Sequence, residues 1–342
     1  MTSTTRTALI TGATSGLGFE AAAQIAEQGY GSVIVTGRTK AKARDARDRL
    51  TTRTKLDVFE SLELDLDEIA SAEAAATALI ERGGTIDLVV LNAGIAPPGN
   101  PDIGPDGIDR VISSSLTGHH VLTVRLIEAG LISDGTRIII AGSEAARGDV
   151  PMFAPLDTEA FAARHFGGDL EAALEAQMRL TGSATYKSGD QYATAKMLVA
   201  WWAAELSRRV PSGVTVNAVS PGSTPDTNAL RRAPWVMRNV MVPIFKIMPG
   251  MSHSVADGAG RYLEVAGYDE RVSGRFFASP GKKMTGGLQR IELPHLTDRR
   301  LQRAGWNATV AVTGVDLLTF VPLPAAATRP ASVPTTVLQE AA

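Results

Sequence analysis

Short runs of β-branched residues alternate with longer alanine-rich stretches from the N-terminus onward. The runs are apolar at successive positions, which predicts strands buried on both faces, and the stretches between them are long enough for helices. Helices are predicted over segments such as Gly18–Glu27 and Ser71–Arg82. The predicted strands are Thr7–Thr11, Ser32–Thr36, Ser61–Leu64, Ile86–Leu91, Thr136–Ala141 and Val214–Val219, with a seventh near Arg275–Ala278.

Strands that alternate with helices form a parallel sheet with helices on both faces. Because parallel crossovers are right-handed, we expect an α/β fold with a Rossmann-type, doubly wound parallel sheet. No internal repeat or clear linker divides the chain, so a single domain is expected over residues 1–318. Residues 148–187 are predicted to be an insertion after the fifth strand, with a helix near Leu170–Leu180, and the Pro/Ala-rich residues 319–342 a tail.

The composition excludes several classes of function. Lys and Arg number 34 against 36 Asp and Glu, so there is no basic excess to neutralise a nucleic acid. The chain has no cysteine, which excludes disulfides and thiolate chemistry, and its five histidines lack metal-ligand spacing, so no metal is expected. The apolar run Met197–Ala204 is far shorter than the ~20 residues that span a bilayer, and Asp316 and two prolines interrupt the run Val310–Ala327. We therefore expect a cytoplasmic protein without a membrane span.

A glycine-rich turn, Thr11–Gly18, joins the first predicted strand to the first helix. Its glycines permit positive φ and a close approach of backbone N–H groups to a pyrophosphate, and the dipole of the following helix favours that anion. Many such turns are only tight turns, but a strand, a turn and a helix in this order indicate a dinucleotide site. The expected binding residues are Gly12, Thr14, Ser15, Gly16, Leu17 and Gly18.

Arg38 follows the second predicted strand, where an NAD site needs a carboxylate for the ribose 2′-hydroxyl. A guanidinium would instead pair with a 2′-phosphate through charge-assisted hydrogen bonds. The expected cofactor is therefore NADP(H) rather than NAD(H). The alternative is a solvated surface arginine, which is where most arginines lie.

Four ordered motifs resemble those of the short-chain dehydrogenase/reductase family. The glycine turn has the family's T-G-x-x-x-G-x-G pattern, and the fourth strand ends in the N-A-G of Asn92–Gly94. Tyr192 and Lys196 match the Y-x-x-x-K pair, and Asn217–Gly222 matches the segment that ends in Pro-Gly. The resemblance covers about Thr7–Gly222 and implies an NADP(H)-dependent oxidoreductase that interconverts a carbonyl and an alcohol by hydride transfer.

The resemblance implies further contacts with the cofactor. Asp65 is similar to the acid that meets the adenine amino group, although a helix N-cap is equally allowed at its position. The N-A-G segment is implied to stabilise the sheet beside the cofactor, and the Pro-Gly pair to border the nicotinamide. The cofactor residues that the resemblance adds are Asp65, Leu66, Asn92, Ala93, Gly94, Tyr192, Lys196, Pro221 and Gly222.

The same resemblance implies a catalytic group of Ser143, Tyr192 and Lys196. Positions i and i+4 of a helix share one face, and an ammonium beside a phenol favours the phenolate, so we expect Lys196 to lower the pKa of Tyr192 from its ordinary value near 10. Tyr192 would exchange the proton and Ser143 would hydrogen-bond the substrate oxygen, while Lys196 would also bind the nicotinamide ribose. A solvated tyrosine and lysine would give the same spacing, so the prediction depends on the order of the motifs around them.

Ser115 occupies the position at which the family usually has an asparagine that kinks the helix and holds a water between the lysine and solvent. A serine hydroxyl can bond a helical carbonyl and hold water, but it is shorter. We therefore expect Ser115 to give a weakened proton relay with activity retained. The alternative is a catalytically impaired or regulatory protein that binds NADP without turnover.

The connection from Ser143 to Tyr192 is much longer than in relatives. Because it leaves from the serine and returns to the tyrosine, residues 148–187 are expected near the substrate mouth. A surface insertion without a function is the alternative, since loops tolerate insertion well. His165 within it is expected to be exposed, and the pair of histidines at 119–120 to pack on their helix.

Residues 226–252 are expected to form a lid over the substrate, because their apolar residues recur at three- and four-residue intervals; ordinary packing is the alternative. Ser254–Ala266 and Ser273–Phe277 resemble the branch of the family that contains retinol dehydrogenases and protochlorophyllide reductases. This resemblance implies a bulky, apolar small molecule as substrate. Relatives commonly pair through the helix of the Y-x-x-x-K motif, so Trp201 and Trp202 are candidates for a homo-oligomer interface, although core packing explains at least one of them.

Overall fold

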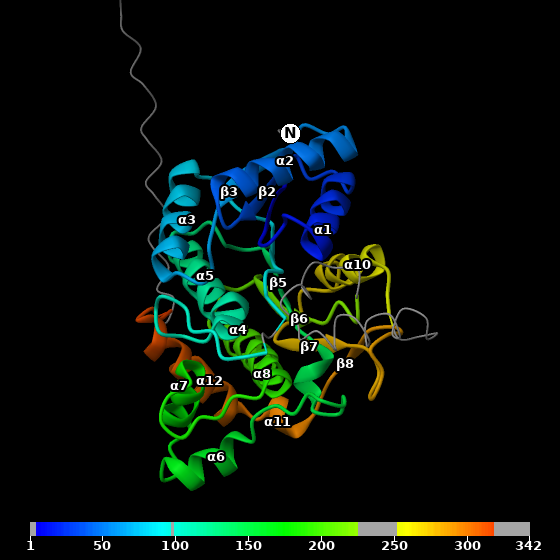
Figure 1. Ribbon diagram of the computed structural model, residues 1–342. Helices are drawn as coiled ribbons and strands as arrows, with labels where there is room; N and C mark the ends of the chain where they lie inside the picture. The colour runs from blue at the N-terminus through cyan, green and yellow to red at the C-terminus, as the bar shows by residue number, and fades with distance from the viewer. Residues whose placement is uncertain (1–4, 97–98, 225–251, 318–342) are drawn as a thin grey trace, which may run out of the picture.

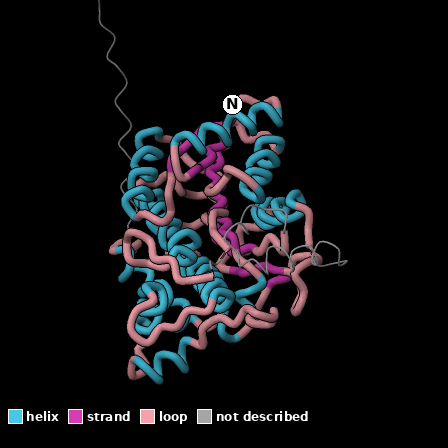
Figure 2. The backbone as a smooth tube through the Cα atoms, in the orientation of Figure 1, coloured by secondary structure: helices cyan, strands magenta, loops and turns pink. Residues whose placement is uncertain are grey.

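The computed structural model describes residues 5–96, 99–224 and 252–317 of the chain. Within these ranges one sheet runs through the molecule, and helices cover both of its faces (Figure 1, Figure 2). The predicted tail at 319–342 lies outside the described residues, as does the predicted lid at 226–252 apart from Ser252.

The described part of the sheet has eight strands in the order β3-β2-β1-β4-β5-β6-β7-β8. All neighbouring pairs are parallel except β7 and β8, which are antiparallel. The strand order reverses between β1 and β4, which confirms the predicted doubly wound, Rossmann-type α/β fold. The strands are β1 (Thr7–Ile10), β2 (Ser32–Gly37), β3 (Phe59–Glu63), β4 (Leu88–Leu91), β5 (Arg137–Ala141), β6 (Thr215–Val219), β7 (Arg275–Ala278) and β8 (Gln289–Arg290). All but the short β8 were predicted.

The helices form one layer on each face of the sheet (Figure 1). One layer contains α1 (Gly16–Glu27), α2 (Lys40–Thr54) and α10 (Val255–Ala266), and the other contains α3 (Ile69–Arg82), α5 (Gly118–Glu128) and α8 (Ser188–Leu206). The remaining helical segments are α4 (Arg110–Ile112), the π-helical turn η1 (Ser113–Thr117), the 3₁₀ turn η2 (Glu144–Arg147), α6 (Thr158–His165), α7 (Leu170–Arg179), α11 (Pro294–Thr297) and α12 (Arg299–Thr313). None of the helices in the described ranges is both long and apolar enough to cross a membrane.

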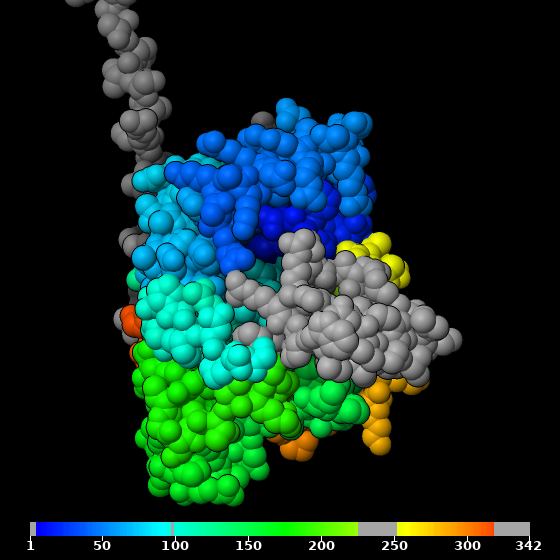
Figure 3. Space-filling view, viewed as in Figure 1, coloured from blue at the N-terminus to red at the C-terminus, as the bar shows by residue number. Residues whose placement is uncertain are grey.

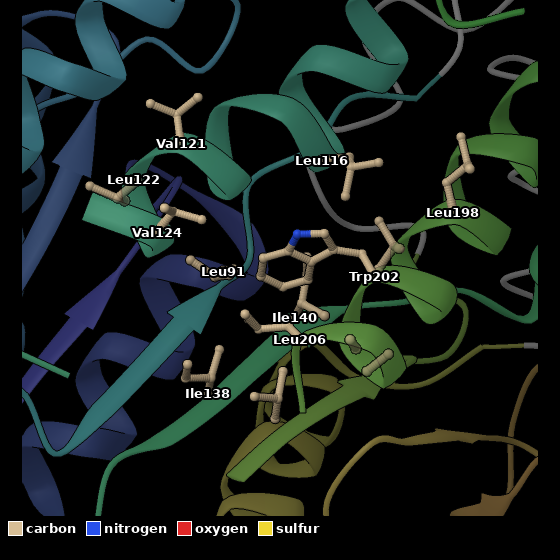
Figure 4. Close-up of a cluster of buried hydrophobic side chains, with 14 of the residues drawn as sticks. Leu91, Leu116, Val121, Leu122, Val124, Ile138, Ile140, Leu198, Trp202 and Leu206 are labelled. Carbon is tan, nitrogen blue, oxygen red and sulfur yellow. The ribbon is translucent and has the colours of Figure 1, made fainter. Parts of the chain in front are cut away.

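The strands are apolar on both faces because each face is covered. Successive residues of a strand point to opposite sides, so Ile10 of β1 packs with α1 and α10, whereas Leu9 packs with α3, α5 and α8. Every residue of β1, β2, β4 and β6 is buried. In the hydrophobic core between the sheet and the layer of α3, α5 and α8, Trp202 of α8 lies near Leu91 of β4 and Ile140 of β5 (Figure 4).

The outer side of α8 is covered by α12, from the C-terminal part of the same chain. Trp201 and Trp202 of α8 and Trp306 of α12 are all fully buried. The indole Nε1 of Trp202 donates to Nδ1 of His120 (3.1 Å), and that of Trp201 donates to the carbonyl oxygen of His295 (2.7 Å). Core packing therefore explains both tryptophans of α8, and neither is available to an oligomer interface.

Residues 148–187, predicted to be an insertion, contribute α6 and α7 at one end of the molecule (green in Figure 3). Helix α7 packs on α12, and Nε2 of Gln177 donates to Oε1 of Gln191 in α8 (2.7 Å). The backbone N–H of Asp109 donates to the carbonyl of Met178 (2.9 Å), which joins the end of α7 to the start of α4. His165 is exposed, and both histidines of α5 are buried, as predicted.

Asp109 is a fully buried acid at the N-cap of α4. Its Oδ1 accepts a hydrogen bond from the backbone N–H of Val111 (3.2 Å). Burial raises the pKa of Asp109 to about 6 from 3.8, and repulsion by Asp102 adds to the rise. The folded protein therefore holds this proton more tightly than the unfolded chain does, so its stability falls as the pH rises from below 3.8 through about 6.

Replacement of Asp109 by Asn should remove this loss of stability with rising pH. An asparagine keeps the N-cap but cannot ionise, so the free energy of unfolding of Asp109→Asn should exceed that of the wild type at pH 8 by up to about 3 kcal/mol. The difference should shrink towards pH 4. Urea unfolding at both pH values measures it, with the exposed Asp57→Asn as the control. An equal gain in the free energy of unfolding at pH 4 and at pH 8 would contradict the raised pKa of Asp109.

Candidate active site

The residues predicted for the site gather at the carboxyl ends of β1, β4, β5 and β6. Ligands of open α/β sheets bind where the strand order reverses, which here is between β1 and β4. The glycine turn follows β1, the N-A-G segment follows β4, Ser143 follows β5, and the Pro-Gly pair follows β6. Helix α8 brings Tyr192 and Lys196 to the same edge.

The glycine turn is held in shape by Asn92. Its Nδ2 donates to the carbonyl oxygen of Thr11 (3.0 Å) and to that of Gly12 (3.4 Å). Gly12 has a φ of +66°, and if another residue replaced it, the new Cβ atom would lie only 2.9 Å from Cα of Ala93. A Cβ at Gly18 would lie 2.4 Å from Nδ2 of Asn92. Glycine is therefore required at both positions by the close approach of the segments that follow β1 and β4.

The N-terminus of α1 is open to an anion. Ser15 is at the N-cap, but its side chain makes no capping hydrogen bond, and the first turn has no acidic residue. Gly16 begins the helix with a φ of +59°. The first backbone N–H groups and the positive end of the helix dipole are thus available to a ligand. This part of the site fits the diphosphate of a dinucleotide.

Arg38 follows β2 beside the same turn. It is exposed, and no ion pair joins it to another residue of the described ranges. A Cβ on the preceding Gly37 would lie 2.9 Å from Cγ2 of Thr14, so the end of β2 touches the turn. Nη1 of Arg49 also donates to the carbonyl of Thr14 (3.2 Å). The sequence did not predict this contact, because nothing in the pattern of α2 distinguishes Arg49 from the other arginines.

Asp65 is half-buried after β3 and is not a helix N-cap. Its Oδ1 accepts the backbone N–H of Asp67 (3.1 Å), while Glu68 is at the N-cap of α3. The N-cap interpretation of Asp65 is therefore wrong. Leu66 is buried, and a Cβ on Gly118 would lie 2.5 Å from its carbonyl oxygen. Leu66 thus packs against the start of α5.

The hydroxyl of Ser143 lies beside the phenol of Tyr192 at the centre of the site and favours the phenolate. Oγ of Ser143 also accepts the backbone N–H of Ala145 (3.2 Å), which leaves the serine proton to donate towards Tyr192. Burial raises the pKa of Tyr192, the hydrogen bond with Ser143 opposes the rise, and the charge of Glu144 adds to it. The predicted lowering of this pKa by Lys196 is therefore wrong for this structure, in which burial is the largest effect.

Lys196 is buried and directed towards the end of β5. Its Nζ donates to the carbonyl oxygen of Ala141 (2.8 Å) and lies 5.8 Å from the centre of the Tyr192 ring. The two side chains share a face of α8, as their spacing predicted. Burial lowers the pKa of Lys196 to about 8. An amine with this pKa changes its charge near neutral pH.

Ser115, predicted to stand where the family has an asparagine, lies in the π-helical turn η1. Its Oγ is buried and has no hydrogen-bond partner within the described ranges. A Cβ on Gly94 would lie 3.3 Å from this Oγ and 3.6 Å from Nζ of Lys196. The hydroxyl and the amine therefore border the same small space beside Gly94. Single π-helical turns are frequent at functional sites.

His119 ties this π-helical turn to the end of β1. Its Nδ1 lies 3.1 Å from the carbonyl oxygen of Ser115, and its Nε2 lies 2.8 Å from Oγ1 of Thr11. Because a carbonyl only accepts, Nδ1 carries the proton and Nε2 accepts from the threonine. Burial lowers the pKa of His119 to about 3, so the ring is neutral at ordinary pH.

The turn after β6 is packed under α10. Gly222 has a φ of +77°, and a Cβ there would lie 3.0 Å from Nη1 of Arg261. A Cβ on Gly258 of α10 would lie 3.1 Å from the carbonyl oxygen of Pro221 and 2.8 Å from Cδ2 of Leu17. Helix α10 therefore holds the Pro-Gly pair beside the glycine turn, although the two are distant in sequence.

The first residues of the insertion lie beside Tyr192. The ring of Phe153 is 5.9 Å from the Tyr192 ring between centres, tilted by 57°. A Cβ on Gly189 would lie 2.0 Å from the carbonyl oxygen of Met152, so this loop packs directly on the first turn of α8. The Met152 side chain is 52% exposed. An apolar surface thus borders the Ser143–Tyr192 pair.

Comparisons with known proteins identify the family of this chain. A family model described as short chain dehydrogenase matches residues 6–177, half of the chain. Mouse polyprenol dehydrogenase is 28% identical over 322 residues, which cover 90% of this chain and 84% of that protein. Human retinol dehydrogenase 13 is 27% identical over 320 residues, which cover 91% of this chain and 85% of that protein. Both support the predicted retinol dehydrogenase-like branch.

Solved structures share the fold. An uncharacterized protein from Mycobacterium paratuberculosis superimposes with a TM-score of 0.64 at 22% identity, covering 92% of this chain and 95% of that one. A short chain dehydrogenase from Burkholderia cenocepacia in complex with NADP superimposes with a TM-score of 0.55 at 22% identity, covering 79% of this chain and 94% of that one.

Replacement of Gly18 by Ala should destabilise the protein, although alanine is the better helix former. The new Cβ would overlap Nδ2 of Asn92 and the carbonyl of Gly12, so we expect a loss of about 1–3 kcal/mol in the free energy of unfolding. Gly287→Ala is the control, because nothing lies within 4 Å of its Cβ position, and it should change stability by less than about 0.5 kcal/mol. Equal urea midpoints for the two variants would show that the turn is not tightly held.

Proposed function

Because this chain belongs to the short-chain dehydrogenase family and is an NAD(P)-dependent oxidoreductase, we propose that it uses NADP(H) to interconvert a carbonyl and an alcohol on a bulky, apolar small molecule. Tyr192 is the proposed acid and base. The observation that carries the proposal is the Ser143 hydroxyl beside the Tyr192 phenol, together with the buried amine of Lys196, at the reversal point of the sheet.

The described residues fit a dinucleotide from one end of the site to the other. The turn at Thr11–Gly18 would hold the diphosphate, Asp65 the adenine, Lys196 the nicotinamide ribose, and Pro221–Gly222 the edge of the nicotinamide. The bound nicotinamide would supply or accept the hydride. The uncapped start of α1 and the crowding at the turn glycines support this placement, because only a backbone without side chains can approach a diphosphate so closely.

The protein groups handle the proton. Ser143 and Tyr192 would hold the substrate oxygen between them, and the raised pKa keeps the Tyr192 phenol protonated at neutral pH, ready to donate to a carbonyl oxygen. In the reverse direction its phenolate would accept the alcohol proton. Hydrogen bonds that strengthen as the oxygen gains negative charge lower the barrier.

Ser115 is proposed to replace the family's asparagine as the group that connects Lys196 to solvent. Its buried hydroxyl faces the same space as Nζ of Lys196 and has a free lone pair to hold a water there. A single hydroxyl offers fewer hydrogen bonds than a carboxamide, so this relay would be weaker than the usual one.

The substrate is proposed to be apolar because the surface beside Tyr192 is apolar. Phe153 and Met152 of the insertion supply an aromatic ring and an exposed thioether at that place. Two of the relatives are named for polyprenol and retinol, which are both apolar alcohols. The proposed lid at 226–252 is consistent with this position, since the N–H of His253 donates to the carbonyl of Ser223 (2.7 Å) and brings the flanking residues together.

Replacement of Tyr192 by Phe should abolish turnover and spare cofactor binding. Loss of the proton donor should lower kcat/KM by about 100-fold or more, while the NADPH Kd stays within about threefold. NADPH oxidation with farnesal, retinal and benzaldehyde measures the rate, and NADPH fluorescence measures the affinity. Tyr30→Phe, on a tyrosine beside Arg6, is the matched control. Undiminished turnover in Tyr192→Phe would refute this machinery, and NADPH binding by the wild type without oxidation of any aldehyde would favour a binding-only protein.

Replacement of Arg38 by Asp should reverse the cofactor preference. A carboxylate repels the 2′-phosphate and accepts from the 2′-hydroxyl, so the NADPH Kd should rise about 10- to 100-fold while the NADH Kd is unchanged or lower. Fluorescence titration with both cofactors measures the ratio. Arg299→Asp, another exposed arginine, should leave the ratio unchanged. The same ratio in Arg38→Asp and the wild type would mean that Arg38 is only a solvated surface residue.

A further inference from the structure

Glu144 is a buried carboxylate that the proposed chemistry does not use. It follows Ser143 directly, opens the 3₁₀ turn η2, and is 1% exposed. A carboxylate in such a place is costly unless hydrogen bonds and a counter-charge surround it. The partners of Glu144 therefore show which segments its position depends on.

Three partners come from three other segments of the fold. Oε2 of Glu144 accepts from Oγ of Ser220, after β6 (2.5 Å), and Oε1 accepts the backbone N–H of Ser279, after β7 (3.1 Å). Nη1 of Arg261, in α10, lies 3.7 Å from Oε1. One carboxylate thus joins the carboxyl ends of β5, β6 and β7 to α10.

The bond to Ser220 leads to the turn at Pro221–Gly222. Oγ of Ser220 donates its proton to Glu144 and accepts the backbone N–H of Gly222 (3.1 Å). The carbonyl of Ser220 accepts from Nη1 of Arg261 (3.1 Å). Because Gly222 has a positive φ and is crowded by Arg261, the turn has little freedom to relax around a lost bond.

Arg261 extends the same network to the far side of the turn. Its Nη2 donates to Nε2 of His253 (2.6 Å) and to the carbonyl of Gly286. The guanidinium is almost fully buried, and Glu144 is the carboxylate paired with it among the described residues. Loss of the negative charge would remove the ion-pair partner of this buried cation and leave only the weaker fields of Glu264 and Asp257.

We propose that Glu144 is a positioning residue of the active site, which holds the Pro221–Gly222 turn in place through Ser220, Ser279 and Arg261. The inference rests on the proposed function, in which this turn borders the nicotinamide. The carboxylate also acts on the catalytic group, since its charge is one cause of the raised pKa of Tyr192. Glu144 would thus link the shape of the cofactor site to the protonation of the proton donor.

Hydrogen exchange in the cofactor-free protein tests the positioning role. In Glu144→Ala the amides of Gly222 and Ser279 should both exchange about tenfold faster or more, as measured by mass spectrometry on peptides that contain them. Ser279 loses the acceptor of its N–H, and Gly222 loses the carboxylate that holds its own acceptor, Oγ of Ser220. Ser220→Ala should accelerate exchange at Gly222 and leave Ser279 unchanged. Glu128→Ala, an exposed glutamate of α5, should change neither. The proposal would be overturned if the Gly222 amide of Ser220→Ala exchanged at the wild-type rate. It would also be overturned if both amides of a folded Glu144→Ala exchanged at their wild-type rates.

A second readout isolates the charge. Glu144→Gln keeps the shape of the side chain, so the phenolate of Tyr192, followed at 295 nm and identified by its loss in Tyr192→Phe, should form at a pH lower by about half a unit or more. An unchanged midpoint would exclude the effect of Glu144 on Tyr192. NADPH should bind Glu144→Ala about tenfold more weakly than the wild type. If the wild type itself bound no NADPH, the proposed function would fail, while the exchange and absorbance results would still decide the role of Glu144.

Discussion

Burial of both faces of the parallel sheet is the constraint on which the rest of the structure depends. A sheet of this kind needs a helix layer on each side, and each helix returns the chain to the start of the next strand. The carboxyl ends of β1, β4, β5 and β6 therefore gather at one edge together with the start of α1. The site lies at that edge because the chain must pass there after every strand, and the glycines at positions 12 and 18 allow the segments to come close enough.

Burial also sets the electrostatics of the site. It raises the pKa of Tyr192 and lowers those of Lys196 and His119, so burial shifts all three groups towards their neutral forms. Behind them, Glu144 and Arg261 pair with each other and with serine and backbone groups. A reaction that moves a hydride and a proton creates charge on the substrate oxygen, and a site whose dipoles are already fixed can stabilise that charge without rearranging.

Local patterns predicted much of this arrangement, and long-range packing decided the rest. Continuous apolar runs predicted seven strands, and spacing alone placed Tyr192 and Lys196 on one face of a helix. The spacing could not show that the amine is directed to the carbonyl of Ala141, or that Glu144 lies close enough to Tyr192 to raise its pKa. The pairing of Glu144 with Arg261 joins residues far apart in the chain, and a charge pattern read along the sequence has no means of matching them.

The cover that α12 provides for α8 has a practical consequence. Trp201 lies at this contact, because a Cβ on Gly305 of α12 would be 3.0 Å from Cε3 of its indole, and Trp306 is buried on α12 one residue further on. Part of the indole emission of this protein therefore comes from this contact, and the same helix α8 carries Tyr192 near its start. Changes in the emission wavelength would report whether the last described helix is seated, independently of any chemistry at the other end of α8.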